Sequence, residues 1–428
     1  MAQRIQFRRG TNAARQTIVP NAGEPVWTTD TNSLYVGDGL TTGGISAGGF
    51  PDSENYIMVQ VTDSESSNGQ ALLDAYATAR AATPYSKPLS EYNPMTILLP
   101  GSVYDLGNTG IIASNGDNWI GFYGLDRREN VIIKGSPRQD PTSNHAVQGI
   151  LLDFAYNNTG INFENLTLLS INTGWGVNGY RNNQTNRKIK FDNVSFIYSG
   201  VLGTGAPVVQ IGGGVGGIFN GVGVYASNSM TDHTFNNCFF SGSFAVADAF
   251  NITLNNCTFN NKLACAFGGA TTERVRLNNC SFIGKSGLTT SAINITDIQS
   301  NFIVQNSFFS GQNSPAVLIA DGSHSCVGLY KDCVFLDAYI QEFEGIMENC
   351  YLESNKAGSP IIQNNNAFGD YARLYNCTLI NNSSFPSTIS GSENLVLAHC
   401  RLNKNITGMT QLLGSTGFSI VSTNITST

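Results

Sequence analysis

The 428-residue chain has few charged residues, since 23 Lys and Arg and 30 Asp and Glu make up only 12% of it. No basic cluster stands out and the formal net charge is −7, so nothing favours binding to nucleic acid or to an anionic membrane surface. No run of about 18 apolar residues occurs, so no membrane-spanning helix is predicted. The first residues, MAQRIQFRRG, lack the apolar stretch of a signal peptide, and we expect a protein that is made and kept soluble in a cytoplasm.

Metal-binding and cofactor motifs are missing as well. The nine cysteines include no Cys-x-x-Cys pair and no Cys/His group with ligand spacing, and the carboxylates lack the spacing of a calcium loop. Residues 212–217 satisfy G-x-G-x-x-G, but they open no convincing helix and no acidic residue follows at the expected distance. We therefore predict neither a metal nor another cofactor, and we interpret this segment as an insertion.

Glycine and asparagine, in contrast, are abundant. The chain has 46 Gly and many Asn-Asn pairs, and both residue types tolerate the positive φ angles of tight turns. With 41% hydrophobic residues it can also bury a large core, so intrinsic disorder is not expected. This composition favours short strands and tight turns over a helical bundle or a doubly wound α/β fold.

One short pattern recurs between Phe163 and Leu402: apolar, any residue, Asn, Cys or small apolar, any residue, Phe or Leu. Its ten copies begin at Phe163, Phe191, Phe235, Leu254, Leu277, Val304, Tyr330, Met347, Leu374 and Leu397. The fourth position advances from copy to copy by 28, 44, 19, 23, 27, 26, 17, 27 and 23 residues, and 44 corresponds to two turns. A repeat in the twenties is typical of a solenoid.

Each copy is predicted to form a strand, a two-residue bend and a second strand. The first apolar residue, the Cys position and the last aromatic residue would point inward, and the Asn of the bend would be left-handed. The spacers contain no amphipathic helix, which argues against a leucine-rich repeat. The pattern predicts an all-β parallel β-helix whose turns stack about every 4.8 Å.

Most of the cysteines occupy one position of this motif. They are Cys238, Cys257, Cys280, Cys333, Cys350, Cys377 and Cys400. In the inward position a thiol acts as a small hydrophobe, so we favour a structural ladder over redox or metal chemistry. The Asn of the motif is predicted to be buried in the turn, bonded to its equivalents above and below.

The repeat region resembles right-handed parallel β-helices of the pectate-lyase-like kind, over about residues 55–428. Residues 70–82 predict a short helix suited to covering the open end of the solenoid. Its apolar face would hold Leu72, Leu73, Tyr76 and Ala79. Residues 96–104, TILLPGSVY, are similar to the first rung of that family, and residues 130–135, NVIIKG, to an early rung that ends in glycine. The resemblance is one of shape and pattern and includes no catalytic signature.

A second resemblance lies in the first fifty residues. It is carried by RIQFRRGT (Arg4–Thr11), AGEP (Ala22–Pro25), TDT (Thr29–Thr31) and LYVGDG (Leu34–Gly39). These blocks resemble the short N-terminal module of tail-fibre and receptor-binding proteins of tailed phages, which attaches the fibre to the virion. Without the resemblance, the residues indicate only a small β-rich unit with glycine-containing turns. The Gly-rich segment 43–49 would be a joint.

Both resemblances imply a phage tail fibre or tailspike. We expect an attachment module at residues 1–50, a linker, capping helix and first strand at residues 51–100, and the parallel β-helix at residues 101–428. The resemblance implies a homotrimer that binds baseplate or tail proteins through its N-terminal module. It also implies a virion component of the tail, assembled in the host cytoplasm without membrane insertion.

Three functions are compatible with this architecture. The leading hypothesis is a non-enzymatic or weakly enzymatic virion adhesin whose β-helix binds a bacterial surface polysaccharide. The second is a tailspike depolymerase, a hydrolase or lyase that cuts this polysaccharide. The third is a purely structural baseplate or capsid-surface component, which would need no glycan contact.

A depolymerase would need two carboxylates close together in a groove, or a carboxylate with a basic group. The acids of the repeat region lie in no recognisable motif. They are Asp153, Asp248, Glu273, Asp297, Asp321, Asp337, Glu342 and Glu344, with His233 and His324 as candidate bases. Asp297 and Asp321 are the weak catalytic candidates, because they lie 24 residues apart, about one turn, in two spacers. Solvated loop carboxylates are the favoured alternative.

Aromatic residues in neighbouring loops are the candidates for glycan binding. Trp175 is flanked by glycines, and Tyr180 and Tyr198 follow in nearby loops. Aromatic rings stack on the flat apolar faces of sugars, although Trp and Tyr also cover the edges of solenoids.

Overall fold

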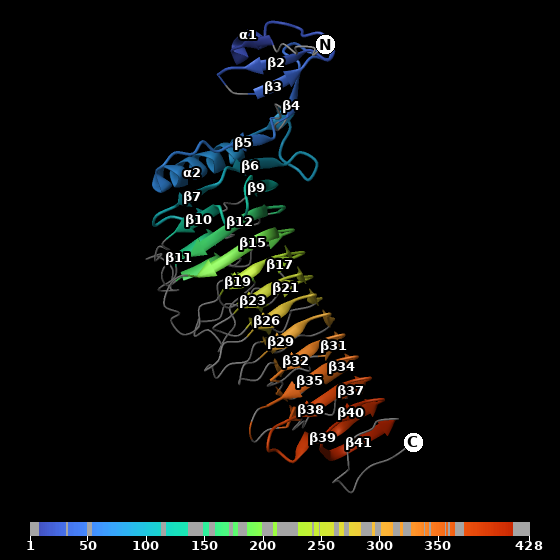
Figure 1. Ribbon diagram of the computed structural model, residues 1–428. Coiled ribbons are helices and arrows are strands. Elements are labelled where there is room, and N and C mark those ends of the chain that lie inside the picture. The colour runs from blue at the N-terminus through green and yellow to red at the C-terminus, as the bar shows by residue number, and fades with distance from the viewer. Residues whose placement is uncertain are drawn as a thin grey trace, which may run out of the picture. The chain divides into compact units, whose positions relative to one another are not determined.

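A computed structural model shows a β-rich chain in two compact units (Figure 1). It describes residues 8–30, 33–48, 54–112, 117–135, 149–153, 159–170, 174–178, 186–198, 209–211, 230–241, 244–247, 249–260, 265–268, 274–283, 293–295, 301–310, 317–319, 327–337, 339–341, 344–355, 357, 360–363 and 372–413. The units are Met1–Ile57 with Thr83–Pro88, and Met58–Ala82 with Leu89–Thr428. The predicted division at residues 50 and 100 stays a prediction. Among the described helices, none is long and apolar enough to span a membrane.

The first unit contains a four-stranded sheet in the order β1-β2-β3-β4. Its elements are β1 (Arg8–Gly10), α1 (Asn12–Arg15), β2 (Pro25–Thr28), β3 (Ser33–Val36), β4 (Ile45–Gly48) and the 3₁₀ turn η1 (Pro84–Ser86). β1 pairs parallel with β2, whereas β2 with β3 and β3 with β4 are antiparallel. The prediction of a joint at residues 43–49 is wrong for residues 45–48, because these residues pair with β3.

Helix α2 (Glu65–Ala81) packs on the first turns of the second unit. Those turns contain β6 (Met95–Leu99), β7 (Ser102–Asp105), β8 (Ile111–Ile112), β9 (Ile120–Gly124) and β10 (Val131–Gly135), and β5 (Tyr56–Met58) precedes the helix. The helix begins at Glu65, after the Ser64 N-cap and five residues earlier than predicted, and it buries Leu72, Tyr76 and Ala79. Gly69 lies against the backbone of Asp105, where a Cβ would be 1.9 Å from the carbonyl oxygen.

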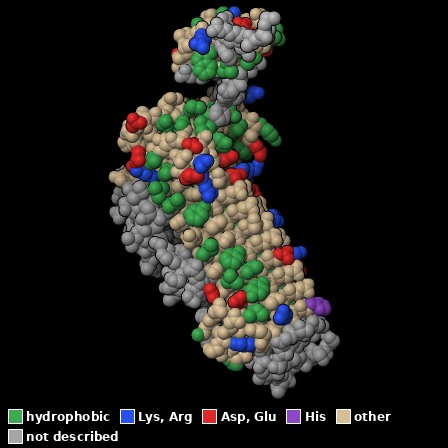
Figure 2. All heavy atoms as spheres, in the orientation of Figure 1, with side chains coloured by type: hydrophobic (Ala, Val, Ile, Leu, Met, Phe, Trp, Pro, Cys, Tyr) green, Lys and Arg blue, Asp and Glu red, His purple; other side chains and the backbone are tan. Residues whose placement is uncertain are grey.

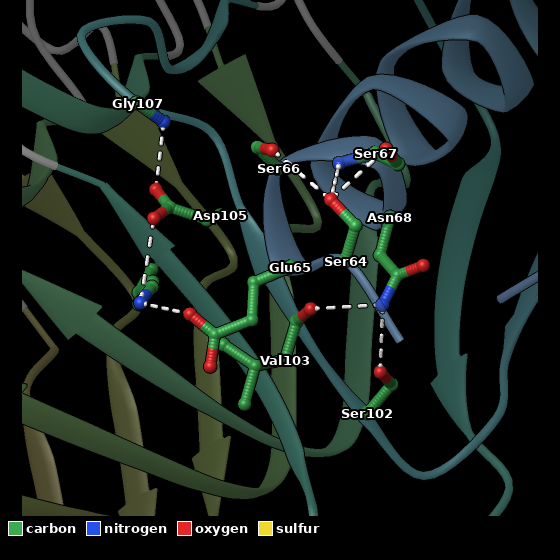
Figure 3. A network of polar contacts seen from close by, with 10 residues as sticks. Ser64, Glu65, Ser66, Ser67, Asn68, Ser102, Val103, Asp105 and Gly107 are labelled. Atoms are coloured by element: carbon green, nitrogen blue, oxygen red, sulfur yellow. Dashed lines mark hydrogen bonds and ion pairs between the residues drawn. The ribbon is translucent and has the colours of Figure 1, made fainter. Parts of the chain in front are cut away.

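Polar contacts fasten the start of this helix to the solenoid (Figure 3). The buried amide of Asn68 donates to Ser102 Oγ at 2.9 Å and to the backbone carbonyl of Thr62 at 3.0 Å. The Lys134 ammonium pairs with the Glu65 and Asp105 carboxylates, which raises the pKa of Lys134. All three charged side chains serve the docking of the helix, so we assign them no chemistry.

The predicted repeat forms the largest sheet, in which parallel strands pair turn by turn. The prediction that the 44-residue interval corresponds to two turns is wrong, because Phe191 pairs directly with Phe235. Strands before the bend are β18 (Thr234–Asn236), β22 (Thr253–Asn255), β25 (Arg276–Asn278), β28 (Phe302–Gln305), β31 (Val327–Lys331), β34 (Glu344–Glu348) and β37 (Ala372–Tyr375). Strands after it are β19 (Phe239–Ser241), β23 (Thr258–Asn260), β26 (Ser281–Ile283), β29 (Phe308–Ser310), β32 (Val334–Leu336), β35 (Tyr351–Ser354), β38 (Thr378–Asn381) and β40 (Arg401–Leu402). The longer strands of this sheet are β12 (Asn162–Ser170), β15 (Lys190–Tyr198), β39 (Ser387–Ala398) and β41 (Asn405–Leu413), and its shorter strands are β33 (Ile340–Gln341) and β36 (Ile362–Gln363).

Two further parallel sheets complete the turns. One contains β8, β11 (Gly149–Asp153), β13 (Gly174–Asn178), β16 (Val209–Ile211), β20 (Phe244–Ala247), β24 (Cys265–Gly268), β27 (Ile293–Ile295) and β30 (Val317–Ile319). The other contains β14 (Asn186–Arg187), β17 (Met230–Thr231) and β21 (Ala249–Phe250). The predicted fold class, an all-β parallel β-helix with a capping helix, is confirmed.

The interior consists of columns of like residues. The seven motif cysteines are buried, and Ser307 takes the cysteine position in one turn. Phe240, Phe259 and Phe282 stack with ring centroids 4.5 Å apart, which matches the spacing of parallel strands. The inward assignment of the cysteines is therefore confirmed, and burial raises the pKa of the Cys257 thiol, as expected for an unreactive side chain.

The bend has the predicted left-handed backbone, with φ between 50° and 57° at its Asn, Asp and His residues. The residues are Asn165, Asn193, Asn237, Asn256, Asn279, Asn306, Asp332, Asn349, Asn376 and His399. Successive amides bond along the axis, for example Asn279 to Asn256 at 2.8 Å. The prediction that they are buried is wrong, because from Asn237 onward these side chains are exposed at the outer corner.

Candidate functional site

Most of the predicted site residues lie outside the part of the chain that the structure describes. Trp175 lies in β13 beside Ile150, and Tyr198 ends β15 beside Ser170, but the side chains of this Trp and this Tyr are outside the described part of the chain. Tyr180, Asp297 and Asp321 also lie outside the described residues. These assignments therefore stay predictions.

The candidate base His233 is a core residue. It is 4% exposed and occupies the column position of Ile189 and Ile252 in the adjoining turns. Its Nδ1 accepts a hydrogen bond of 3.3 Å from the Ile189 backbone N–H, and burial lowers its pKa to about 4. A ring that is enclosed in this way cannot reach a substrate, so a role for His233 as a base is excluded.

Among the predicted acids, Asp337 lies in a polar group near the C-terminal end. Asn355 donates to Asp337 at 3.4 Å, and Asn382 donates to Glu353 at 3.1 Å and to Asn355 at 3.3 Å. The Tyr351 hydroxyl donates to Glu353 at 2.7 Å. The bonds of Asn355 and Asn382 connect successive turns as the Asn ladder does, and we assign the group no catalytic role. No set of three potential metal ligands occurs among the described His, Cys, Asp and Glu residues.

A second left-handed corner lies three residues before the first apolar residue of the rung in seven successive turns. We call its residues the corner column: Trp119, Gly160, Lys188, Asp232, Asn251, Arg274 and Asn301, with φ from 53° to 69°. The strand register places them on successive turns, since Gly121, Asn162, Lys190, Thr234, Thr253, Arg276 and Ile303 pair in that order. Lys188, Asp232, Arg274 and Asn301 are exposed, and Trp119 and Asn251 are half-buried.

Trp119 is held in this conformation by bonds on both sides. Its N–H donates to the Thr159 carbonyl at 2.8 Å, and its carbonyl accepts from the Met95 N–H at 2.9 Å. The ring lies against Gly160, where a Cβ would be 2.2 Å from a ring carbon. The glycine therefore makes room for the indole in the next turn.

Cations lie over the two aromatic rings at this corner. Lys188 Nζ is 5.6 Å from the centre of the Trp119 ring and 3.2 Å from a Glu91 carboxylate oxygen. The Arg274 guanidinium is 4.7 Å from the centre of the Phe250 ring. Tyr92, next to Glu91, is 95% exposed.

Sequence reasoning missed the corner column, although its signal was present. Its residues all stand three positions before the first apolar residue of a rung, from Trp119 before Phe122 to Asn301 before Val304. Their conformation could not be read from this offset, because Trp, Lys and Arg are not residues that predict a left-handed turn.

In the N-terminal unit, polar side chains hold two turns in place. Arg15 is 4% exposed, donates to the Gly43 carbonyl at 2.9 Å and lies 3.6 Å from the centre of the Tyr35 ring. The Asp38 carboxylate accepts bonds from the Thr41 hydroxyl and from the Thr41 and Leu40 N–H groups, which lower its pKa to about 2. Leu40 is thereby displayed with 86% of its surface exposed.

Comparison with known families supports the N-terminal prediction. Residues 5–41 match the family described as the major tropism determinant N-terminal domain. The search of curated proteins gave no match. The match, together with the β-helix, confirms the resemblance to phage tail fibres, and it supports either a tail adhesin or a depolymerase.

Among solved structures, the chain is similar to the Agl-KA catalytic domain, with 12% identity and a TM-score of 0.52, over 89% of this chain and 69% of that one. It is also similar to the A-module of Azotobacter vinelandii mannuronan C-5 epimerase AlgE4, with 12% identity and a TM-score of 0.44, over 87% and 100% of the two chains. A third is ORF18 of Geobacillus virus E2, with 13% identity and a TM-score of 0.42, over 91% and 75%. The first similarity shows a common fold and no common function, and we infer nothing from the two lower scores.

Proposed function

We propose that the protein is a virion adhesin of a tailed phage that attaches to a bacterial surface polysaccharide. The observation that carries this proposal is the N-terminal match at residues 5–41, followed along the chain by a parallel β-helix. The N-terminal unit attaches to baseplate or tail proteins during assembly in the host cytoplasm. Trp175, Tyr180 and Tyr198 stay predicted contacts to the glycan.

The exposed apolar residues of the N-terminal unit support attachment to a protein partner. Leu40 is 86% exposed and Val19 is 50% exposed. The Gly39 N–H donates to the carbonyl of Pro20 at 3.2 Å, so the turns that carry these two side chains are bonded to each other. Exposed apolar side chains such as these stabilise a complex when a partner protein buries them, because their apolar surface is then removed from water.

We also propose that the protein is a homotrimer. Supporting this, apolar side chains gather on the outer surface of β29, β32 and β35 (Figure 2). The half-buried outward residues of this surface are Ile283, Phe308, Val334, Leu336, Tyr351 and Ile380. The described residues of its strands, β26, β29, β32, β35 and β38, include one charged residue, which is Glu353. Identical copies can therefore face one another with little like-charge repulsion.

Val334→Lys tests the trimer by light scattering during size-exclusion chromatography. The lysine places a charge on this surface, and we expect the trimer to become a monomer. Leu329→Lys is the matched control, because Leu329 is a half-buried outward residue of β31, before the bend. A Val334→Lys trimer would contradict the use of this surface.

The function itself is tested with surface polysaccharide from a strain that the phage infects. The purified protein is incubated with the glycan, and the glycan's chain length is followed by size-exclusion chromatography. We expect unchanged length and co-elution with the protein. Progressive shortening would show a depolymerase, and neither binding nor cleavage would favour a structural component.

A further inference from the structure

The corner column has a backbone cost that the motif bend, five residues later in each turn, avoids. At the motif bend, eight of ten left-handed residues are Asn, which tolerates this conformation. In the corner column three turns carry Trp119, Lys188 and Arg274 instead, and a left-handed backbone costs such residues roughly 1–2 kcal/mol each. The same fold could use Asn there, so these side chains are not required by the geometry of the turn.

For Lys188 and Arg274, the exposed contacts with neighbouring side chains are weak and offset this cost only in part. The pair between Lys188 and Glu91 is exposed on both sides, and such surface pairs contribute about 0–1 kcal/mol. The Lys188 and Arg274 cations near their rings are exposed too. Residues whose backbone strain is not offset by stabilising contacts are concentrated at binding and catalytic sites.

The chemistry of the column fits a carbohydrate. Trp119 and Phe250 are half-buried rings, and an aromatic ring packs against the apolar C–H face of a sugar. The column also offers the Lys188 ammonium, the Asp232 carboxylate and the Asn251 amide. The Asn251 amide donates to one Asp232 oxygen, and the remaining N–H groups and oxygens can bond hydroxyl groups. Aromatic rings close to hydrogen-bonding groups are the complement of a hydroxyl-rich chain.

The column is also linear. One residue per turn at a spacing of about 4.8 Å places Asn301 roughly 29 Å from Trp119 along the axis. The turn at Ser90–Asn93, closed by hydrogen bonds of 3.2 and 3.0 Å, is held at the start of the column by Glu91 and displays Tyr92. A polymer lying along the solenoid would contact several of these residues at once, whereas a single sugar would not.

We propose that the corner column from Trp119 to Arg274, with Tyr92, is a polysaccharide-binding site of this protein. This inference rests on the proposed function and names its site. Trp119 and Tyr92 stack against sugar rings, and Lys188, Asp232 and Asn251 bind hydroxyl groups. Gly160, which has no side chain, leaves room for the Trp119 indole.

The test is binding of the full-length protein to immobilised surface polysaccharide from a strain that the phage infects, measured by interferometry. Trp119→Asn removes the ring and places a residue suited to φ of 59°, so the fold should be retained. We expect binding to weaken about tenfold or more, as for the loss of one aromatic stacking contact. Tyr92→Ser, at a side chain that is 95% exposed, should also weaken binding without changing the melting temperature.

His399→Asn is the matched control, because His399 is exposed and left-handed, with φ of 57°, at the motif corner. It should bind as wild type does. Wild-type affinity in both Trp119→Asn and Tyr92→Ser would overturn the site and leave the proposed function standing. Absence of binding by the wild-type protein would overturn both.

Discussion

The buried histidine of the β-helix predicts a specific dependence of stability on pH. His233 lies in a column of aliphatic residues, and its pKa falls from the ordinary 6.5 to about 4 because burial disfavours the charged ring. Below pH 6.5 the unfolded chain therefore binds a proton that the folded chain does not, and the free energy of unfolding decreases as the pH falls. The decrease is complete near pH 4 and amounts to about 3 kcal/mol.

His233→Ile isolates this contribution, because isoleucine occupies the same position at Ile189 and Ile252. The substitution removes the acceptor of the Ile189 N–H, so it should cost about 1–3 kcal/mol at neutral pH. Urea unfolding of both proteins at several pH values gives the difference between their free energies of unfolding. The contributions of the other titrating groups cancel in this difference. We expect this difference to change by about 3 kcal/mol in favour of the variant between pH 6.5 and pH 4. Parallel pH profiles would refute the reasoning.

Three further outcomes are expected. Cys280→Asp places an unpaired charge in the dry cysteine ladder, costs several kcal/mol of folding free energy and should abolish soluble protein. Cys280→Ser should fold, because Ser307 already takes this position in another turn. Recovery of soluble Cys280→Asp protein with an unchanged melting temperature would contradict the packing. Asn256→Ala should lower stability by about 1 kcal/mol and Asn256→Gly by less, measured by urea unfolding, and an equal loss in both would argue against a role of the left-handed backbone. Deletion of residues 1–45 should leave the β-helix folded by circular dichroism but absent from purified virions, and its incorporation would disprove the attachment role.

The fold was predictable because its information is local and repeated. Each rung carries its own inward residues and its own left-handed Asn, as at Phe235, Asn237 and Cys238, and stacking identical rungs requires no further specification. The burial of the Asn ladder was predicted wrongly, because hydrogen bonding along the axis satisfies these amides equally well at an exposed corner. The length of the capping helix was also underestimated, since its start depends on the Ser64 cap and on contacts of Asn68 with Ser102, 34 residues away.

The site was far less predictable, for a physical reason. In a solenoid, a surface is assembled from residues one turn apart, and the irregular spacing of 17 to 44 residues conceals which of them are neighbours. The amino-acid sequence specified the repeat, the inward columns and the N-terminal module, because each depends on residues close together in the chain. The three-dimensional structure was needed to show that His233 is enclosed and that Trp119, Gly160 and Lys188 meet at one corner, because only the register of the strands places them side by side.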